Sequence, residues 1–359
     1  MAIINSGQLT AQEVILYNAT VMAGLENAVT AITDIWSEKV ALIRPVVAEG
    51  SGTDPMSKKI PSSMVFPFSP ATAQAEDLSE QDRPFHPLVR NSVKIDIKNY
   101  GTGYYVLRKD FYNDIYSTLA YVPKKLARAA TKAVDIQLAR LLRNGKTTLD
   151  YTGTFAFSTT KPISVNGAVS GTYSNLYTST ALTSINVGSV VQDMMGRLNE
   201  DGLSLGLQPD TLIVPPTLYQ AAQIAINMKN IVFSGTGGVG NLAPGQANNT
   251  AAVGDNWIAM SGQIKQIVVA PELIGTGSAP ADRTTWYVAE CLNEEHGGAA
   301  GLVVARDPGF EFLTNLSPSD WDVYTRNRFS WRLSGIWVWD MVSRASSAAV
   351  NSSDLAYLA

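Results

Sequence analysis

Residues 50–87, GSGTDPMSKKIPSSMVFPFSPATAQAEDLSEQDRPFHP, separate two regions whose apolar patterns predict folded structure. Prolines recur along the whole stretch, at Pro55, Pro61, Pro67, Pro70, Pro84 and Pro87. Each proline removes a backbone donor and disfavours helix, so neither a compact helix nor a central strand fits. A loop of this length inside a compact domain is uncommon and usually functional. We interpret the stretch as an extended arm that lies on a partner surface, such as another copy of the chain.

Two apolar segments, residues 62–68 and 85–97, predict the legs of an extended hairpin in this region. Residues 92–98 alternate between apolar and charged side chains, which is the period of a strand with one buried face. The glycine-rich residues 99–103 predict a turn, and residues 104–107 predict a further strand. The arm is therefore expected to lead directly into a sheet.

The composition limits the classes of protein to consider. The 359 residues are enough for two or three domains or subdomains. Charged residues make up 16% of the chain and the net charge is −4, so there is no overall basic surface for nucleic acid. Low charge is typical of a surface that neighbours cover, although a soluble monomer with a neutral surface has the same composition.

Other features of the composition bear on the compartment. Cys291 is the only cysteine, which excludes an internal disulfide framework and is typical of assembly in a reducing cytoplasm. The first residues have no signal-peptide pattern, and every apolar run is too short to span a bilayer. We therefore expect no membrane association.

The strongest helical pattern in the chain covers residues 122–143. Its apolar positions share one face: Leu126, Ala130, Val134, Leu138, Leu141 and Leu142. Its polar positions lie largely on the other: Arg128, Lys132, Asp135, Gln137 and Arg140. Pro123 suits a first turn and Asn144-Gly145 a C-terminal stop. At about 1.5 Å per residue, this helix should be roughly 30 Å long.

Alternating helices and strands across residues 183–305 predict a sheet flanked by helices. The expected elements are a helix at 183–203, a strand at 211–214, a helix that Pro215-Pro216 starts, and strands at 264–270, 286–291 and 301–305. The expected buried set of the first helix is Val187, Val190, Val191, Met194, Met195 and Leu198. Aromatic segments at 321–324, 329–333 and 336–339 predict closing strands that pack on the long helix. The fold class is therefore α+β.

Two literal catalytic motifs occur, and both lack the context that their chemistry needs. Residues 235–240 match G-x-G-x-x-G, but poor helix-forming residues follow, whereas a dinucleotide site needs a helix N-terminus. Residues 202–206 match G-x-S-x-G around Ser204, but a helix precedes the serine and a strand follows it, the reverse of a nucleophile elbow. A flexible glycine loop and an ordinary turn are the favoured interpretations.

Metal chemistry has little support in the sequence. His86 and His296 are the only histidines, and they lie in the proline-rich arm and in the turn at residues 294–298. A solvated turn is favoured over a divalent-metal site there, because no second set of ligands has a recognisable spacing. We predict no catalytic residue, no cofactor and no metal.

The order of elements itself resembles one family, the major capsid proteins of tailed bacteriophages, whose fold is called the HK-ninety-seven fold. Several local segments are also similar to this family: DIQLARLLRNG at 135–145, PDTLIVPPTL at 209–218, and IVVAPEL at 267–273 followed by WYVA at 286–289. The last pair is similar to the major head subunits of Mu-type phages. The resemblance covers nearly the whole chain as an architecture.

The resemblance implies a division of the chain. Residues 1–49 would be an N-terminal arm with helices, and residues 50–98 the extended loop that lies on a neighbouring subunit. Residues 99–184 would form the peripheral domain, with a spine helix at 122–143. Residues 185–318 would form the axial domain, and residues 319–359 would return to the peripheral domain and end in a tail.

Two sets of site residues follow from this layout. The expected inter-subunit contacts in the arm are Lys58, Lys59, Phe66, Phe68, Phe85 and Arg90. The expected basic face of the spine helix comprises Arg128, Lys132, Arg140 and Arg143. A solvated or inter-subunit face is the favoured reading of these four residues, with sequence-independent phosphate contact as the alternative.

The implied function is structural. The chain would self-assemble into pentamers and hexamers of an icosahedral head enclosing double-stranded DNA, with non-specific contact to the DNA. Its implied partners are copies of itself, a separate scaffolding protein, a portal protein and a decoration protein, with assembly in the cytoplasm of a host bacterium. The alternatives are a phage tail or baseplate protein, which the long helix disfavours, and a hydrolase that uses Ser204.

Overall fold

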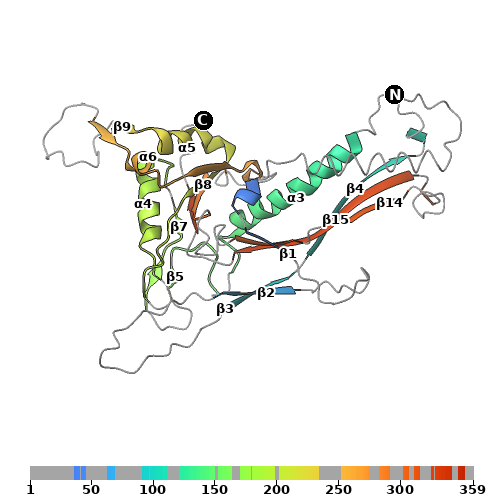
Figure 1. Cartoon of the computed structure of the whole chain (residues 1–359), viewed down its shortest axis with the longest axis horizontal. Coiled ribbons are helices and arrows are strands. Elements are labelled where there is room, and N and C mark those ends of the chain that lie inside the picture. Colours follow the sequence, from blue (N-terminus) through green and yellow to red (C-terminus); the bar gives the residue numbers. More distant parts are fainter. Residues whose placement is uncertain are drawn as a thin grey trace, which may run out of the picture.

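The computed structural model describes residues 36–40, 42–45, 63–68, 91–96, 98–107, 109–110, 121–149, 153–163, 170–178, 180–198, 202–233, 252–274, 283–291, 302–306, 311–315, 325–326, 328–341 and 347–351. In Figure 1, helix α3 (Val122–Asn144) runs along strand β15 (Arg328–Met341). Helices α4 (Ser184–Met195), α5 (Tyr219–Asn227) and α6 (Trp257–Ser261) gather beyond one end of α3. The mixture of helices and strands confirms the predicted α+β class. The helices expected within residues 1–35 lie outside the described residues.

Helix α3 is 23 residues long and begins with a proline in its first turn, as predicted. Leu126, Val134, Leu138 and Leu142 of the predicted apolar face are buried. The opposite face differs at one position, because Asp135 is also buried. Helix α3 contacts β15, so the long helix and the closing aromatic strand pack together as expected.

The end of α3 at Gly145 has a different cause from the one predicted. Gly145 has a right-handed backbone, with φ of −58°, and not the left-handed one of a common glycine stop. A Cβ atom at this position would lie 2.4 Å from the ring of Phe157. Glycine therefore lets the buried Phe157 ring pack directly on the end of the helix.

The sheet below α3 is built around β15. Strand β4 (Lys98–Leu107) pairs along one edge of β15, and β13 (Leu302–Arg306) and β14 (Glu311–Asn315) pair along the other. Strand β1 (Leu42–Pro45) adds to β13 in parallel. The predicted turn at 99–103 is wrong, because these residues continue β4 and pair with residues 332–336. The two strands predicted at 329–333 and 336–339 are one continuous strand, and the segment at 321–324 lies outside the described residues.

A second sheet lies between α3 and the other helices. Its strand order is β11–β8–β12–β16–β7. Its bounds are β7 (Leu176–Tyr177), β8 (Thr211–Val214), β11 (Gln266–Val269), β12 (Thr285–Ala289) and β16 (Ser347–Asn351). Short 3₁₀ turns flank it: η1 (Trp36–Lys39), η4 (Pro216–Leu218) and η5 (Pro271–Leu273). Two small sheets have two strands each: β5 (Lys161–Pro162) pairs with β6 (Thr172–Tyr173), and β9 (Asn230–Phe233) pairs with β10 (Ala252–Asp255).

The alternation of side chains along β8 and β12 divides the core in two. Ile213 and Tyr287 pack with Leu138 and Leu142 of α3. The neighbouring residues of the same strands, Leu212 and Trp286 among them, pack with Val187, Val190, Val191 and Met194 of α4. A strand buried on both faces needs mostly apolar side chains, which explains the short runs LIV at 212–214 and WYVA at 286–289.

The strand pairings differ from the expected domain bounds in two places. Residues 302–306 and 311–315 pair within the sheet of β15, although we expected residues 185–318 to form one domain. Residues 347–351 pair between β12 and β7, although the end of the chain was expected to stay with the peripheral domain. Helix α4 ends at Met195, and Met195 and Leu198 are exposed, so their predicted burial is wrong.

Candidate assembly site

The predicted arm contains a hairpin. Strand β2 (Ser63–Phe68) pairs antiparallel with β3 (Asn91–Asp96), with Phe66 opposite Val93 and Phe68 opposite Asn91. The two strands pair with no other strand of the described residues, and β3 contacts β15. Figure 1 shows the pair apart from α3, on the other side of the β15 sheet. The other predicted contact residues, Lys58, Lys59, Phe85 and Arg90, lie outside the described residues.

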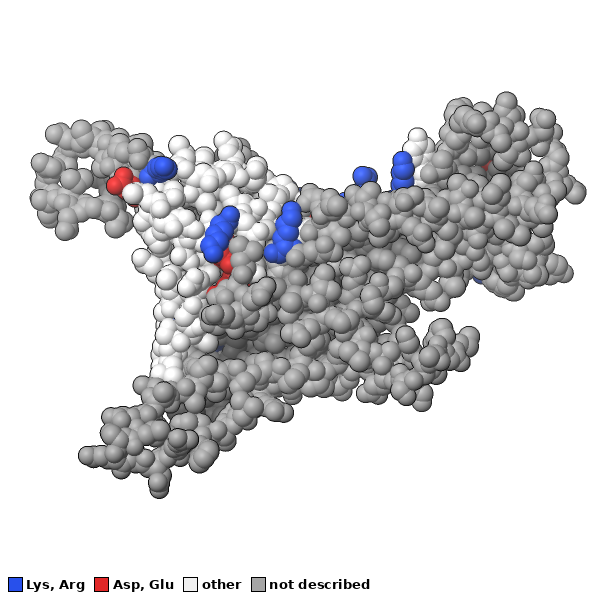
Figure 2. Space-filling view, viewed as in Figure 1, with Lys and Arg blue, Asp and Glu red and all other residues white. Residues whose placement is uncertain are grey.

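The predicted basic positions of α3 differ in exposure. Arg128, Lys132 and Arg140 are exposed and follow one another at helical spacings of four and eight residues. Arg143 is half-buried, and its Nε atom is buried without a hydrogen-bond partner. On the side of the molecule shown in Figure 2, Lys and Arg of the described residues stand singly and form no continuous basic patch.

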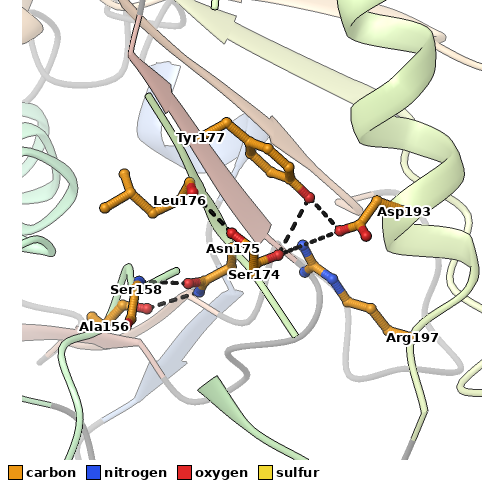
Figure 3. Close-up of polar contacts among 8 residues, drawn as sticks. All are labelled: Ala156, Ser158, Ser174, Asn175, Leu176, Tyr177, Asp193 and Arg197. Carbon is orange, nitrogen blue, oxygen red and sulfur yellow. Dashed lines mark hydrogen bonds and ion pairs between the residues drawn. The ribbon is translucent and has the colours of Figure 1, made fainter. Parts of the chain in front are cut away.

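A polar cluster that the sequence analysis did not single out joins residues 174–177 to the end of α4 (Figure 3). The Arg197 guanidinium donates to the carbonyl oxygen of Ser174 at 2.9 Å and lies 3.6 Å from the Asp193 carboxylate. The Tyr177 hydroxyl donates to the same carboxylate. The pKa of Tyr177 is raised above its ordinary value, mainly because the hydroxyl is buried and secondly because it donates to Asp193. The spacing of Asp193 and Arg197, four residues apart, was the available signal in the sequence.

A second part of the cluster fixes the loop before it. The side chain of Asn175 is fully buried, accepts from the backbone N–H of Ser158 at 2.7 Å and donates to the carbonyl of Ala156 at 2.8 Å. Arg197 also lies over the Tyr173 ring, 5.0 Å from its centroid. These contacts join the uncharged loop residues 156–158 and 173–175 to the helix-flanked sheet. We therefore assign the cluster a structural role.

The structure gives the catalytic motifs no further support. Ser204 is exposed, α4 precedes it and β8 follows it, which is the order that the sequence predicted. The glycine-rich residues 235–240, His86 and His296 lie outside the described residues. Within the described part of the chain, no group of three or more His, Cys, Asp or Glu residues could hold a metal ion. Among the described helices, none combines the length and the apolar character that a membrane span requires.

The fold matches those of phage shell proteins. The structure of the PhiM1 bacteriophage mature capsid aligns with 99% of this chain and 91% of its own, with a TM-score of 0.51 and 9% identity. The procapsid of bacteriophage JBD30 aligns with 96% of this chain and 76% of its own, with a TM-score of 0.50 and 12% identity. A structure of Gordonia phage Cozz aligns with 89% and 86%, with a TM-score of 0.50 and 12% identity. At such low identity the likeness concerns the fold, which is that of a phage capsid protein.

The sequence itself carries the family assignment. The model of a family described as phage capsid protein matches residues 90–349, and the chain belongs to this family. A search of curated proteins gave no match. The protein is therefore a structural major capsid protein of a phage head, with an HK-ninety-seven-like fold, and a component of the virion. Its self-association into a shell is the function that its surfaces must support.

Proposed function

We propose that this chain assembles into the pentamers and hexamers of an icosahedral head that encloses double-stranded DNA, and that residues 50–98 are its assembly arm. The observation that supports the arm is that, among the described strands, β2 and β3 form hydrogen-bonded pairs only with each other. A two-stranded hairpin is marginally stable in water, so it gains stability by lying on another surface. In a shell, that surface belongs to the neighbouring subunit, and Phe66 and Phe68 of β2 are among the contact residues.

Deletion of residues 53–82 tests the arm, because it removes β2 and leaves both core clusters intact. The free subunit should keep its unfolding midpoint, and electron microscopy should show no closed particles. The folding of the shortened free subunit is checked by circular dichroism and by a single sharp species on size-exclusion chromatography. Normal closed particles from the shortened chain would refute the arm.

The proposal extends to partners. We include a separate scaffolding protein, a portal protein and a decoration protein, with assembly in the cytoplasm of a host bacterium. Non-specific contact with the packaged DNA is assigned to Arg128, Lys132 and Arg140, since all three are exposed on α3. Each phosphate contact contributes a slope of about −0.9 to the dependence of log affinity on log salt concentration.

The DNA contact has a matched test on the free subunit. Replacement of Arg128, Lys132 and Arg140 by Gln should reduce the salt slope of binding to duplex DNA by about one unit for each lost phosphate contact. The control is the replacement of two exposed lysines outside α3, Lys229 and Lys265, by Gln. An unchanged slope in the α3 variant would remove these residues from the proposal and leave the shell-forming function unaffected.

A further inference from the structure

The C-terminal end of α3 carries a dipeptide that can modify itself. Asn144 is followed by Gly145, and in an unfolded chain the backbone nitrogen of a glycine attacks the side-chain carbonyl carbon of a preceding asparagine. Glycine favours this reaction, because it has no Cβ atom to obstruct the approach and its backbone rotates freely. Asn144 is exposed, so water reaches its side-chain amide, whereas Gly145 is buried. The end of the helix therefore holds a reactive pair whose two halves lie in different surroundings.

The reaction is a deamidation that needs only water. The Gly145 nitrogen loses its proton to hydroxide and forms a bond to the Cγ atom of Asn144. The bond from Cγ to Nδ2 breaks, and Nδ2 takes up a proton from water and leaves as ammonia. Water then opens the five-membered succinimide ring at either of its two carbonyl carbons. One opening gives aspartate at this position, and the other gives isoaspartate, in which the former side-chain carbons belong to the main chain.

The helical backbone of Asn144 holds the two reacting atoms apart. Asn144 is the last residue of α3, and a helical residue has ψ of about −42°. A five-membered ring is nearly flat, so the Cβ, Cα and C atoms of Asn144 and the nitrogen of Gly145 must lie close to one plane before it closes. At a helical ψ the nitrogen lies far out of that plane. Asn144 therefore has to rotate about its Cα–C bond before it can react.

Three hydrogen bonds oppose this rotation. The backbone carbonyl of Asn144 accepts from the N–H groups of Thr147 and Thr148, each at 2.8 Å, and from the Thr147 hydroxyl at 3.1 Å. Rotation about the Cα–C bond turns the carbonyl away from all three donors. The N–H of Gly145 is itself engaged, since it donates to the carbonyl of Leu142 at 3.4 Å. Asn144 therefore reacts only after these hydrogen bonds are broken.

Phe157 covers the other side of the pair. Its N–H donates to the carbonyl of Gly145 at 2.7 Å, and its ring lies 2.4 Å from the position that a Cβ atom of Gly145 would take. The ring is 1% exposed and packs against Tyr287 in the core that α3 shares with the second sheet. Movement of Gly145 toward the Asn144 side chain therefore requires the end of α3 to separate from Phe157.

We infer that Asn144-Gly145 is a deamidation site that the fold keeps inactive, and that it reacts when the end of α3 separates from Phe157. The product prevents the original contact from forming again. A new carboxylate at the end of α3 opposes the negative end of the helix dipole, and isoaspartate adds a methylene to the main chain just before Gly145. The reaction therefore marks, irreversibly, each subunit in which this contact has opened. The inference rests on the geometry of the contact and is independent of the proposed shell.

Peptide mapping by mass spectrometry measures the reaction at each asparagine. The chain has a second Asn-Gly pair, Asn166-Gly167, which serves as a reference in the unfolded chain. In guanidinium chloride at mildly alkaline pH, both pairs should deamidate at similar rates, and Gly145→Ala should slow the reaction at Asn144 alone. In the folded wild-type subunit, Asn144 should react about tenfold more slowly than in guanidinium chloride, or slower still. Equal rates at Asn144 in the two states would overturn the inference.

Thr147→Val tests the hydrogen bonds that hold the carbonyl. Valine lacks the hydroxyl that donates to Asn144, so the end of α3 should open more often and Asn144 should react severalfold faster in the folded subunit. Thr180→Val is the matched control, because the Thr180 hydroxyl also donates to a backbone carbonyl at 3.1 Å, in an exposed segment outside residues 144–157. Circular dichroism verifies that both variants stay folded during the reaction. Equal rates at Asn144 in the two variants would overturn the inference.

Discussion

The substitution Gly145→Ala should destabilise the subunit, although its backbone favours the change. Gly145 has φ of −58°, which alanine adopts without strain. Where nothing obstructs the new methyl group, such a change stabilises a protein by about 0.4–1 kcal/mol, because it reduces the freedom of the unfolded chain. The sign of the measured effect therefore depends on what the methyl group meets.

The methyl group would meet a fixed ring. Its carbon would lie 2.4 Å and 2.6 Å from two carbon atoms of the Phe157 ring, whereas carbon atoms at optimal contact lie about 3.5–4.0 Å apart. The ring has to shift by about 1 Å. Phe157 is 1% exposed and lies against Tyr287 at a centroid distance of 5.8 Å, and its N–H donates to the carbonyl of Gly145 at 2.7 Å. Overpacking of this kind costs about 1–3 kcal/mol.

Urea unfolding of the free subunit, followed by circular dichroism, measures the effect. We expect Gly145→Ala to lower the free energy of unfolding by about 1–2 kcal/mol. In a Phe157→Leu background the loss should shrink by about 1 kcal/mol or more, as a coupling energy between contacting residues. A Gly145→Ala subunit as stable as the wild type, or additive effects of the two changes, would refute the reasoning.

Three further predictions concern the helix-flanked sheet. Asn256→Ala should lower the free energy of unfolding by about 2–4 kcal/mol, because it leaves the carbonyls of Ala225 and Met228 without their buried donor. Asn256→Asp should be no more stable than Asn256→Ala, because an aspartate carboxylate only accepts hydrogen bonds. Wild-type stability of Asn256→Asp would contradict this argument. Thr183 is the N-cap of α4, and its hydroxyl accepts from the N–H of Asn186. In urea unfolding, Thr183→Ala should lower the free energy of unfolding by about 1 kcal/mol, and Thr183→Ser should lower it much less. Equal losses in the two variants would contradict the cap argument. Burial raises the pKa of the Cys291 thiol from 9.0 to about 12, so the folded state holds the proton more tightly, and the free energy of unfolding should fall as pH rises above about 9. The fall should be smaller in Cys291→Ala, and identical pH slopes between pH 8 and 10.5 would show that the thiol does not contribute.

Local patterns in the sequence predicted the elements that depend on one segment. The face of α3 that carries Leu126 and Leu138 and the strand at 211–214 were both predicted correctly. Helical and strand periods, N-caps and prolines act within a few residues, so one sequence contains the information. The family also followed from the order of such elements.

Interactions between distant segments produced the errors. Residues 99–103 resemble a turn because they contain two glycines, yet they form a strand because β15 supplies hydrogen bonds along their whole length. The pairing of β4 with β15 also joins the segments at 329–333 and 336–339, which were predicted as two strands, into one continuous strand. Backbone pairing between segments more than two hundred residues apart overrides local glycine preferences, since glycine weakens a strand by only about 1 kcal/mol.

The candidate site shows the same division. The sequence by itself predicted the arm, because six prolines disfavour a compact helix or central strand in residues 50–87. The sequence did not reveal that Trp257 and Met260 are exposed, because such large apolar side chains are typical of a core, and only the packing of α6 against α4 and α5 leaves them exposed. Burial depends on which surfaces meet in three dimensions, so the tertiary structure alone decided which of these apolar side chains are exposed.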